Sequence, residues 1–559
     1  MAHSGGPNEG KWLRLFEKSA VVVFLAAAGI FLASAFIRDT TPPAESISAS
    51  IEAHAYSMPN NGWAPLTVYF SALGSESPNG AIVRYEWDLD GNGAFETDAT
   101  ANSGYASYTY NKPRDYTISV RVTDTSGAVG VASTTVTVRH PASSSVDYWS
   151  VFDDTRVRRV DIALSKAEWD KMWVDPISKY QAKADATVFG QRLDDVGFRM
   201  RGQFSLRNSG AKKPFKIDID AYIDGQEYEN LRQLMFLNSI GDPSLQYEKL
   251  AYGMMEFAGL PASHVAYVEL WIDLTDDDQD PIFWGVYAMV ERVDNKYIGN
   301  RFGRDAKGGN LYKASHAQRG PMDLVYWGDS IEEYPVQNGQ YAYGKMNNEG
   351  EADYSDIVAL CRTVDGRDFE TEEEYIKALE EAINVDAFLR YIAVNMIIDN
   401  WDSYINTGNN YYLFNNPVSG RFEWIPWDLT WGGNPTSDVF TRAEFGMMEN
   451  GAPLFDKTMR IEKYRDAYTA YLDLIARHYF TLENMSGIIR RNHNLIAPYV
   501  VQSGGDKGFF GTSTMFPYEE FENSPNALIN FVSERVEYLE EAIQSELEGE
   551  NTAVQEEQP

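Results

Sequence analysis

The sequence predicts a multidomain protein in which a small β-sandwich precedes a larger domain of mixed α and β structure. Three observations lead to this prediction. Six strand-like runs separated by turn residues fill residues 49–139, strand patterns continue to about residue 293, and amphipathic helical patterns dominate afterwards. The length of 559 residues also exceeds what a single hydrophobic core usually supports.

The chain is strongly acidic, with 48 Lys and Arg against 82 Asp and Glu and a formal net charge of -34. This charge excludes a general role in holding nucleic acid, because the phosphate backbone would be repelled. Basic proteins and metal ions are the more natural partners. The single cysteine, Cys361, excludes an intrachain disulfide.

A basic segment and an apolar segment open the chain. Residues 1–18 contain three basic side chains, and the uncharged residues 19–37 are long enough to cross a bilayer. The positive-inside rule places residues 1–18 in the cytoplasm and the rest of the chain outside. The alternative is a cleaved signal peptide, since Ala33-Ser34-Ala35 fits a cleavage site. We therefore expect a bacterial cell-envelope protein, either anchored with its ectodomain outside or secreted, with residues 38–48 as a linker.

Residues 49–139 have the pattern of an antiparallel, immunoglobulin-like β-sandwich, with Gly, Pro, Asn and Asp between short strands. Three stretches are informative: Ala64-Pro65-Leu66-Thr67-Val68, Tyr85-Glu86-Trp87-Asp88, and the run from Tyr116 to Asp124. Together they resemble a PKD domain, an extracellular module. This resemblance implies a spacer or a binding module without catalysis.

Within this domain, oxygen-bearing side chains at alternate positions followed by Gly93 match the start of a calcium loop. The twelfth position is Ala99, so the loop is not an EF-hand, which needs a bidentate Glu there. Calcium binding requires closure by Glu96 or Asp98, and an Asp-Gly turn that binds nothing is the alternative. The calcium ligands predicted here are Asp88, Asp90, Asn92 and Glu96.

A second linker, residues 140–150, leads into the large domain, residues 151–547. A β-rich lobe extends to about residue 297, and the α-rich lobe that follows contains a capping box, Thr371 with Glu374, at the start of a helical run. Two lobes of different structure imply a cleft, where ligands often bind. The acidic residues 548–559 have the composition of a disordered tail.

Two carboxylates bracket a predicted β-hairpin in the α-rich lobe. Asp402 precedes the strand at residues 410–414, and Asp428 follows the return strand at 421–427. Pairing of the strands brings both ends together, with Asn409 and Asn410 beside them. A kinase site needs an Asp that orients the attacking hydroxyl, together with an Asn and a second Asp that hold Mg²⁺. The alternative is a polar hairpin with solvated ends.

Basic residues in the β-rich lobe are suited to phosphate binding. Arg201 ends a strand before a polar loop, and Lys213 and Lys216 follow the loop. Alternation places Lys213 on the apolar face, where an unpaired lysine is costly, so Lys213 is the better phosphate anchor and Lys216 the more solvated residue. An ordinary basic hairpin is the alternative.

Two glutamates complete the predicted site. Glu248 lies on a helix that we expect to start at Asp242-Pro243-Ser244 and to end near Ala258, and it would pair with Lys213 as a helix Glu pairs with a strand Lys in kinases. An exposed Glu248 is the alternative. Glu291 directly follows an apolar strand, where a hinge between lobes would meet an adenine.

Short motifs recur in order across the large domain: Arg201-Gly202, Lys212-Lys213-Pro214-Phe215, Leu237-Asn238-Ser239, Asp242-Pro243-Ser244, Gly259-Leu260-Pro261, Gly285-Val286-Tyr287 with Glu291, Asn310-Leu311-Tyr312-Lys313, Asn400-Trp401-Asp402, Asn410-Tyr411-Tyr412-Leu413 and Ile425-Pro426-Trp427-Asp428. Each is weak alone. Together they resemble the CotH family of atypical secreted protein kinases, named for a spore-coat kinase.

This resemblance implies ATP binding between two lobes, with Mg²⁺ or Mn²⁺, and transfer of the γ-phosphoryl group to Ser or Thr of exported proteins. The acidic charge of the chain favours substrates rich in Lys and Ser. It implies that Asp402 orients the hydroxyl, that Asp428 holds the metal with Asn409 or Asn410, and that Lys213 contacts the phosphates.

The chain departs from the family pattern at two positions. Thr430 stands where the family often has the second Asp of Asp-x-Asp, and Tyr247 stands where an Arg is usual. Loss of a carboxylate would weaken the metal site. The second hypothesis is therefore a non-catalytic surface adhesion or matrix-binding protein with a pseudokinase-like domain. A metal-dependent hydrolase is a weak third, because the sequence has no His-Glu-x-x-His motif and no Gly-x-Ser-x-Gly at a strand-helix turn.

Overall fold

The computed structural model describes residues 50–139, 148–208, 210, 212–276, 278–442, 448, 450–505 and 516–556. The predicted membrane segment at residues 19–37, its two flanking segments and most of the second linker lie outside these residues. In the part of the chain that is described, no helix has both the length and the apolar character that a bilayer crossing requires.

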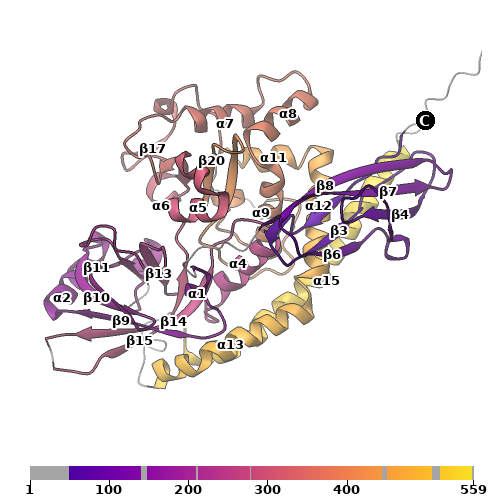
Figure 1. Cartoon of the computed structure of the whole chain (residues 1–559). Coiled ribbons are helices and arrows are strands. Elements are labelled where there is room, and N and C mark those ends of the chain that lie inside the picture. Colours follow the sequence, from indigo (N-terminus) through magenta and orange to yellow (C-terminus); the bar gives the residue numbers. More distant parts are fainter. Residues whose placement is uncertain are drawn as a thin grey trace, which may run out of the picture. The chain divides into compact units, whose positions relative to one another are not determined.

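The first described domain is a sandwich of two sheets, which confirms the predicted fold (Figure 1). One sheet has the order β1 (Tyr56–Met58), β3 (Leu66–Ser71), β6 (Ala106–Tyr110). The other has the order β2 (Asn61–Trp63), β8 (Val129–Arg139), β7 (Arg114–Asp124), β4 (Ile82–Asp88), β5 (Thr97–Asp98). Alternation along β7 buries Tyr116, Ile118, Val120 and Val122 in the same core as Trp87.

The large domain begins with a closed barrel, the β-rich lobe that the sequence predicts. The order around it is β10 (Ala182–Val188), β11 (Gln191–Met200), β12 (Phe215–Asp218), β13 (Gln233–Leu237), β15 (Ile282–Val290), β14 (Val265–Leu274), β9 (Arg158–Leu164). Neighbours are antiparallel except β14 and β9, which are parallel. Closure pairs every strand on both sides and encloses an apolar core that includes Phe198 and Met289. The same stretch of chain forms the helices α1 (Tyr148–Val151), α2 (Lys166–Val174) and α3 (Phe204–Asn208).

Helix α4 (Tyr247–Phe257) has Gln246 as its N-cap, four residues later than the predicted cap Asp242, so the expected start is wrong. The Asp242 carboxylate accepts hydrogen bonds from the backbone N–H groups of Ser244 and Tyr247 at 2.8 and 2.7 Å. Between them Leu245 has a φ of 59°, which is incompatible with a right-handed helix. Asp242 therefore orders the turn in front of α4 and also satisfies the N–H of its first residue, Tyr247, and burial raises the pKa of Asp242 to about 6.

The α-rich lobe contains a sheet as well as helices. The sheet order is β19 (Gly344–Lys345), β16 (Leu311–Lys313), β20 (Tyr411–Asn416), β21 (Arg421–Pro426), and β17 (Val336–Gln337) pairs separately with β18 (Gln340–Tyr341). The helices are α5 (Asn295–Phe302), α6 (His316–Arg319), α7 (Ser355–Asp365), α8 (Glu372–Ala382), α9 (Val385–Ile397), α10 (Tyr404–Thr407), α11 (Pro453–Thr458), α12 (Glu462–His478), α13 (Leu482–Gly505) and α15 (Tyr518–Glu556). Helix α15 continues into the acidic tail.

The capping box is confirmed, because Thr371 caps α8 and Glu374 reciprocates. The helical run after it is two helices rather than one. Ile383 takes an extended conformation, and the Asn384 side chain accepts a hydrogen bond from the Ala387 N–H and starts α9. Helix α9 is almost wholly buried and ends at Ile397, just ahead of Asp402, so it holds the backbone that leads into the predicted site.

The predicted β-hairpin is present as β20 and β21, in antiparallel register with Tyr411 opposite Pro426. Asp402 lies before its first strand and Asp428 directly after its second. The tight core beneath it includes Trp424, whose ring stacks on Tyr411 with 4.3 Å between centroids. This packing fixes the hairpin ends in place.

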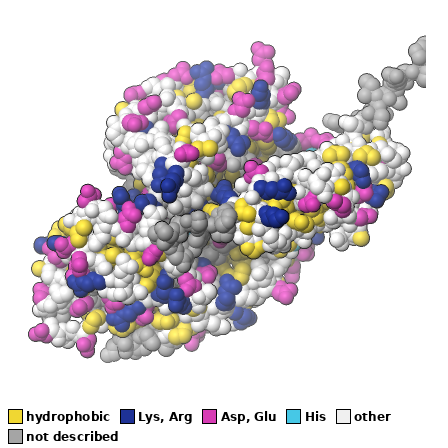
Figure 2. Space-filling view, viewed as in Figure 1, with side chains coloured by type: hydrophobic (Ala, Val, Ile, Leu, Met, Phe, Trp, Pro, Cys, Tyr) yellow, Lys and Arg dark blue, Asp and Glu magenta, His cyan; other side chains and the backbone are white. Residues whose placement is uncertain are grey.

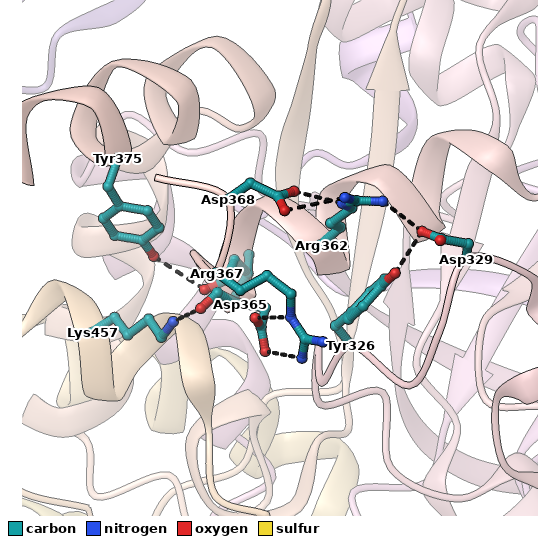
Figure 3. Close-up of polar contacts among 9 residues, drawn as sticks. Tyr326, Asp329, Arg362, Asp365, Arg367, Asp368, Tyr375 and Lys457 are labelled. Atoms are coloured by element: carbon teal, nitrogen blue, oxygen red, sulfur yellow. Dashed lines mark hydrogen bonds and ion pairs between the residues drawn. The ribbon is translucent and has the colours of Figure 1, made fainter. Parts of the chain in front are cut away.

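A network of ion pairs and hydrogen bonds surrounds the end of α7 and the loop after it (Figure 3). Arg362 is at its centre, with Asp368 at 2.5 Å and Asp329 at 2.7 Å. These three side chains are exposed, so each ion pair contributes little to stability. The labelled residues are Tyr326, Asp329, Arg362, Asp365, Arg367, Asp368, Tyr375 and Lys457.

The acidic composition is visible on the surface. Figure 2 shows Asp and Glu side chains spread over the face in view, with Lys and Arg in separate small groups. An anion approaching this protein therefore meets an unfavourable overall charge, and any anion site must be built from a local concentration of cations.

Candidate functional site

Asp402 is held rigidly at the start of the hairpin. Its Oδ1 accepts hydrogen bonds from Asn409 Nδ2 at 3.1 Å and Thr407 Oγ1 at 2.9 Å, and its Oδ2 accepts one from Asn410 Nδ2 at 2.9 Å. Burial raises the pKa of Asp402, the three side-chain hydrogen bonds oppose that rise, and the charge of Asp428 adds to it. The carboxylate is thus oriented by its neighbours and interacts with the second predicted carboxylate.

Asp428 ends the hairpin in an unusual backbone conformation. Its φ is 50°, and Asn410 at the other hairpin end has a φ of 59°. Non-glycine residues in this left-handed region are uncommon and cluster at functional sites. The Asp428 N–H donates to Tyr252 Oη of α4 at 3.2 Å, which ties the hairpin end to that helix, and the Asp428 side chain is exposed.

Glu248, in the first turn of α4, joins these carboxylates. Burial raises the pKa of Glu248 well above its usual range, and the charge of Asp428 raises it further, while Arg201 opposes the rise. Its Oε2 is buried and accepts no hydrogen bond from a donor among the described residues, while the Asp428 carboxyl lies within hydrogen-bonding reach of the Glu248 side chain. A buried oxygen without a partner is costly, so this position favours a ligand that supplies one.

Lys313 is the cation that sequence reasoning missed. It ends β16, opposite Tyr412 of β20, and its Nζ lies 5.4 Å from the Tyr412 ring centroid and 5.1 Å from that of Trp427. Burial lowers the pKa of Lys313 to about 7, and Arg201 and Arg292 lower it further, whereas Asp428 opposes them. The available signal was a lysine at the end of an apolar strand, whereas Lys213 was chosen because alternation places it on the apolar face of the strand that follows it.

More cations continue from Lys313 into the barrel. Burial lowers the pKa of Lys216 to about 8, and the charges of Arg199 and Arg292 also lower it. Lys216 is 7% exposed and pairs with Asp218 at 2.9 Å, so the expectation that Lys216 is the more solvated lysine is wrong. Burial lowers the pKa values of Arg199 and Lys179, and the charge of Arg201 lowers both further. This group, which we call the cation cluster, consists of Lys179, Arg199, Arg201, Lys216, Arg292 and Lys313.

The structure does not form the expected pair of Lys213 with Glu248. Lys213 is buried, and its Nζ donates to the backbone oxygen of Leu206 in α3 at 2.6 Å. The charges acting on Glu248 are those of Asp428, Arg201 and Asp242. The ammonium group of Lys213 therefore has a hydrogen-bond acceptor in the preceding loop. A buried lysine can be stabilised by a nearby backbone carbonyl and does not need a bound phosphate.

Glu291 is part of an internal ion pair. It is 1% exposed, its Oε2 lies 2.6 Å from Arg301 Nη2, and the same oxygen accepts a hydrogen bond from the His264 N–H at 3.2 Å. Its own N–H donates to the His264 oxygen at 2.9 Å. Burial raises the pKa of Glu291 to about 7. These contacts give Glu291 a structural role just after β15. The sequence predicted that Glu291 would lie beside an adenine instead.

The predicted calcium loop gathers three of its carboxylates. One oxygen each of Asp88, Asp90 and Glu96 lie within 4.8 Å of one another. Asp88 accepts hydrogen bonds from the Gly93 N–H at 2.8 Å and from two other backbone amides, while Asn92 Nδ2 donates to Glu96 Oε1 at 2.8 Å. The loop is therefore well ordered by its own hydrogen bonds, and calcium binding stays a prediction.

Comparison with known proteins places both domains. The model of the CotH kinase protein family matches residues 198–539, and that of the PKD domain matches residues 55–138. The chain belongs to the CotH kinase family. The CotH region includes Arg201, Glu248, Lys313, Asp402 and Asp428, whereas Lys179 of the cation cluster lies before it.

A curated relative in the CotH family is inner spore coat protein H of Bacillus subtilis (strain 168), 23% identical over 385 residues, which cover 68% of this chain and 93% of the relative. Among solved structures, the PKD1 domain of Vibrio anguillarum Epp is 28% identical and covers 17% of this chain and 99% of its own, with a TM-score of 0.14. The PKD1 domain from Vibrio cholerae metalloprotease PrtV is 24% identical and covers 16% and 98%, with a TM-score of 0.13.

Proposed function

We propose that this CotH-family chain is an extracytoplasmic protein kinase that transfers the γ-phosphoryl group of ATP to Ser or Thr of exported or cell-surface proteins. One observation carries the proposal. Two members of the cation cluster, Lys313 and Arg201, interact electrostatically with Asp428 and Glu248, and Asp428 in turn interacts with Asp402, in a protein whose net charge is -34. Burial and mutual repulsion lower the pKa values of Lys179, Lys216 and Lys313, an effect that a bound anion would oppose, and a bound cation would likewise stabilise the neighbouring carboxylates. A metal-bound triphosphate supplies both.

Asp402 would act on the acceptor hydroxyl. Three side-chain hydrogen bonds fix its orientation, and its raised pKa makes it a better proton acceptor than a solvated Asp. The hydroxyl oxygen would attack phosphorus as its proton moves to Asp402, and the bond to the bridging oxygen of the leaving diphosphate would break. Positioning of this kind accounts for most catalysis in phosphoryl transfer.

The residues present fit a divalent metal ion, Mg²⁺ or Mn²⁺, which when bound would neutralise the phosphate oxygens. Asp428 offers an exposed carboxylate, and the buried Oε2 of Glu248 offers a second oxygen in place of the carboxylate absent at Thr430. Of the two asparagines, Asn409 uses both ends of its amide, since its Oδ1 accepts from the His316 N–H at 3.0 Å. Asn410 is therefore the better third ligand.

The phosphates would lie against Arg201, Arg292 and Lys313. Arginine forms bidentate contacts with phosphate oxygens, and a lysine whose pKa is lowered to about 7 gains most from an anion, because binding restores its charge. Lys313 thus takes the role that the sequence suggested for Lys213.

We propose a class of acceptor protein and a cellular location for the same activity. An acidic surface favours acceptor proteins rich in Lys and Ser, through charge complementarity. Residues 19–37 would anchor the protein in the bacterial envelope with the described domains outside, or would be removed to release it.

The test is transfer of radiolabelled γ-phosphate from ATP to Ser-containing basic peptides by purified residues 50–559, with Mg²⁺ or Mn²⁺. We expect label on Ser or Thr, and we expect Asp402→Asn to lower the rate at least about 100-fold. Asn111→Ala, on the exposed rim of the sandwich, is the matched control. Labelling that survives Asp402→Asn would overturn the assignment of Asp402.

The alternative is a non-catalytic adhesion or matrix-binding protein with a pseudokinase-like domain, favoured by Thr430. Thermal unfolding separates the two. ATP with Mg²⁺ raises the Tm of a nucleotide-binding protein by mass action. The adhesion hypothesis predicts the same Tm with and without nucleotide.

A further inference from the structure

The PKD domain contacts the ends of two helices in the CotH kinase region. Asn61 Nδ2 donates to the oxygen of Gly259, just after α4, at 2.5 Å. Asn60 Nδ2 donates to Asp386 Oδ2, in the first turn of α9, at 2.9 Å. Asn60 directly precedes β2 and Asn61 is the first residue of β2, so the start of one strand of the PKD domain contacts both helices.

The contact at Gly259 is closely fitted. Gly259 has a φ of 76°, and a Cβ placed there would lie 3.0 Å from Asn60 Oδ1 and 3.2 Å from Asn60 N. Only glycine combines this conformation with so close an approach. The start of β2 in the PKD domain and the end of α4 are therefore shaped for each other.

Further contacts extend this interface along α12. Tyr105 Oη donates to Asp473 Oδ2 at 2.9 Å, and the Tyr69 ring stacks on His478 with 4.1 Å between centroids. Tyr56 and Met58 of β1 belong to the same hydrophobic core as the α-rich lobe. A spacer joined only by a linker would bury no such residues, so the PKD domain is packed as part of the larger unit.

The site residues lie toward the opposite ends of these helices: Glu248 is in the first turn of α4, and Asp402 follows the last residue of α9 by five positions. Gly259 is eleven residues from Glu248, and Asp386 is eleven residues from Ile397, which precedes Asp402. At 1.5 Å per residue each span is about 17 Å. Arg390 of α9 joins the two helices, because its Nη1 donates to the Ala258 oxygen at 3.3 Å and its Nε lies 3.0 Å from Asp386 Oδ2.

We propose that the PKD domain positions Glu248 and Asp402 by fixing the far ends of α4 and α9. A helix transmits displacement along its axis as a stiff rod, so a shift at Gly259 or Asp386 moves the carboxylates together. Asn60 and Asn61 are positioning residues in this proposal, which rests on the proposed kinase function. The PKD domain is then part of the structure that orders the site, rather than a spacer.

The first test measures backbone hydrogen exchange by mass spectrometry in chains that keep both domains. Asn61→Ala removes the hydrogen bond to Gly259, and Asn60→Asp places a like charge against Asp386. Ser133→Ala is the matched control, since it removes an exposed hydrogen bond to Ser119 inside the same domain. We expect faster exchange in α4 and α9 in both interface variants and not in the control, with exchange in β7 unchanged.

The second test follows catalysis in the same variants. We expect kcat to fall about three- to thirty-fold while the KM for the peptide changes less than twofold, since coupling along such contacts is modest. Unchanged exchange in α4 and α9, or an equal loss of kcat in Ser133→Ala, would overturn the proposal. Hydrogen exchange needs no catalysis, so a wild type that transfers no phosphate would defeat the kinase function while leaving the positioning proposal decided by the exchange data.

Discussion

The ammonium group of Lys313 and the carboxylate of Asp428 interact electrostatically across the end of the β20–β21 hairpin. Lys313 comes from the neighbouring strand, and Arg201 reaches the same place from the barrel. This relationship joins the two lobes at one site. It also makes Lys313, rather than the lysine favoured by sequence, the residue on which nucleotide binding should depend.

Lys313→Met should weaken binding of ATP with Mg²⁺ by about 10- to 100-fold, because one cation with a charge-assisted contact to phosphate is lost. Isothermal titration calorimetry measures the Kd directly. Lys213→Met is the comparison: it removes the hydrogen bond to Leu206, and it should change the Kd less than threefold. Equal effects of the two changes would restore the assignment to Lys213.

Nucleotide affinity should fall as the pH rises above about 7. The pKa of Lys313 is lowered to about 7, so above that pH the ligand-free protein has lost this charge and must take up a proton to bind an anion. The linkage predicts up to a tenfold loss of affinity per pH unit. Lys313→Arg keeps its charge throughout, so its affinity should fall less steeply than that of the wild type above pH 7, with a residual loss near pH 8 where Lys216 titrates. A slope in Lys313→Arg as steep as in the wild type would assign the titration to another group.

Glu248→Gln should weaken Mn²⁺ binding by about tenfold or more, since it removes the carboxylate that substitutes for the one absent at Thr430. Thr430→Asp should strengthen binding by restoring the family's second Asp. Electron paramagnetic resonance of free Mn²⁺ gives both values without any need for catalysis. Glu373→Gln, an exposed residue on α8, is the control. A Glu248→Gln variant with wild-type Mn²⁺ affinity would remove Glu248 from the metal site.

Gly259→Ala should destabilise the protein by about 1 kcal/mol from its left-handed backbone, plus the cost of the collision with Asn60. Gly225 separates these contributions, because its φ is 77° and nothing lies within 4 Å of the position a Cβ would take. Urea unfolding should therefore give a larger loss in Gly259→Ala than in Gly225→Ala. Equal losses of unfolding free energy in the two variants would show that the contact with the PKD domain does not contribute to stability.

Calcium at millimolar concentration should raise the Tm of the wild type, if the loop of Asp88, Asp90 and Glu96 binds it as extracellular modules do. Asp90→Asn should abolish the rise, whereas Asp115→Asn, on an exposed part of β7, should not. A Tm that calcium leaves unchanged would establish that the turn binds nothing and is held only by its own hydrogen bonds.

Local patterns predicted most of the fold. Alternation in β7, the capping box at Thr371 and the turn residues after Asn416 each act within a few positions, so the sandwich, α8 and the hairpin could be read from the chain. The start of α4 was missed because Leu245 adopts a left-handed conformation that no residue preference announces. The packing of the PKD domain on α4 was missed because the start of a strand and a glycine about 200 positions apart carry no shared signal.

The candidate site was half predictable for the same reason. Asp402, Asn410 and Asp428 are joined by one hairpin, which brings them together within a single local element. Lys313 and Arg292 reach the site from other segments, and only the arrangement of strands shows that Lys313 lies beside Tyr412. Lys213 shows what the sequence pattern could not predict. Its burial was expected correctly, but its ammonium group donates a hydrogen bond to a backbone carbonyl of the preceding loop, which the pattern does not reveal.

The most direct test of the kinase account is mass spectrometry of residues 50–559 and of a Ser- and Lys-containing peptide after incubation with ATP and Mg²⁺ or Mn²⁺. The account predicts phosphorylated Ser or Thr with the wild type and none with Asp402→Asn or Asp428→Asn. A folded wild type that binds ATP yet leaves itself and every peptide unmodified with either metal would contradict it.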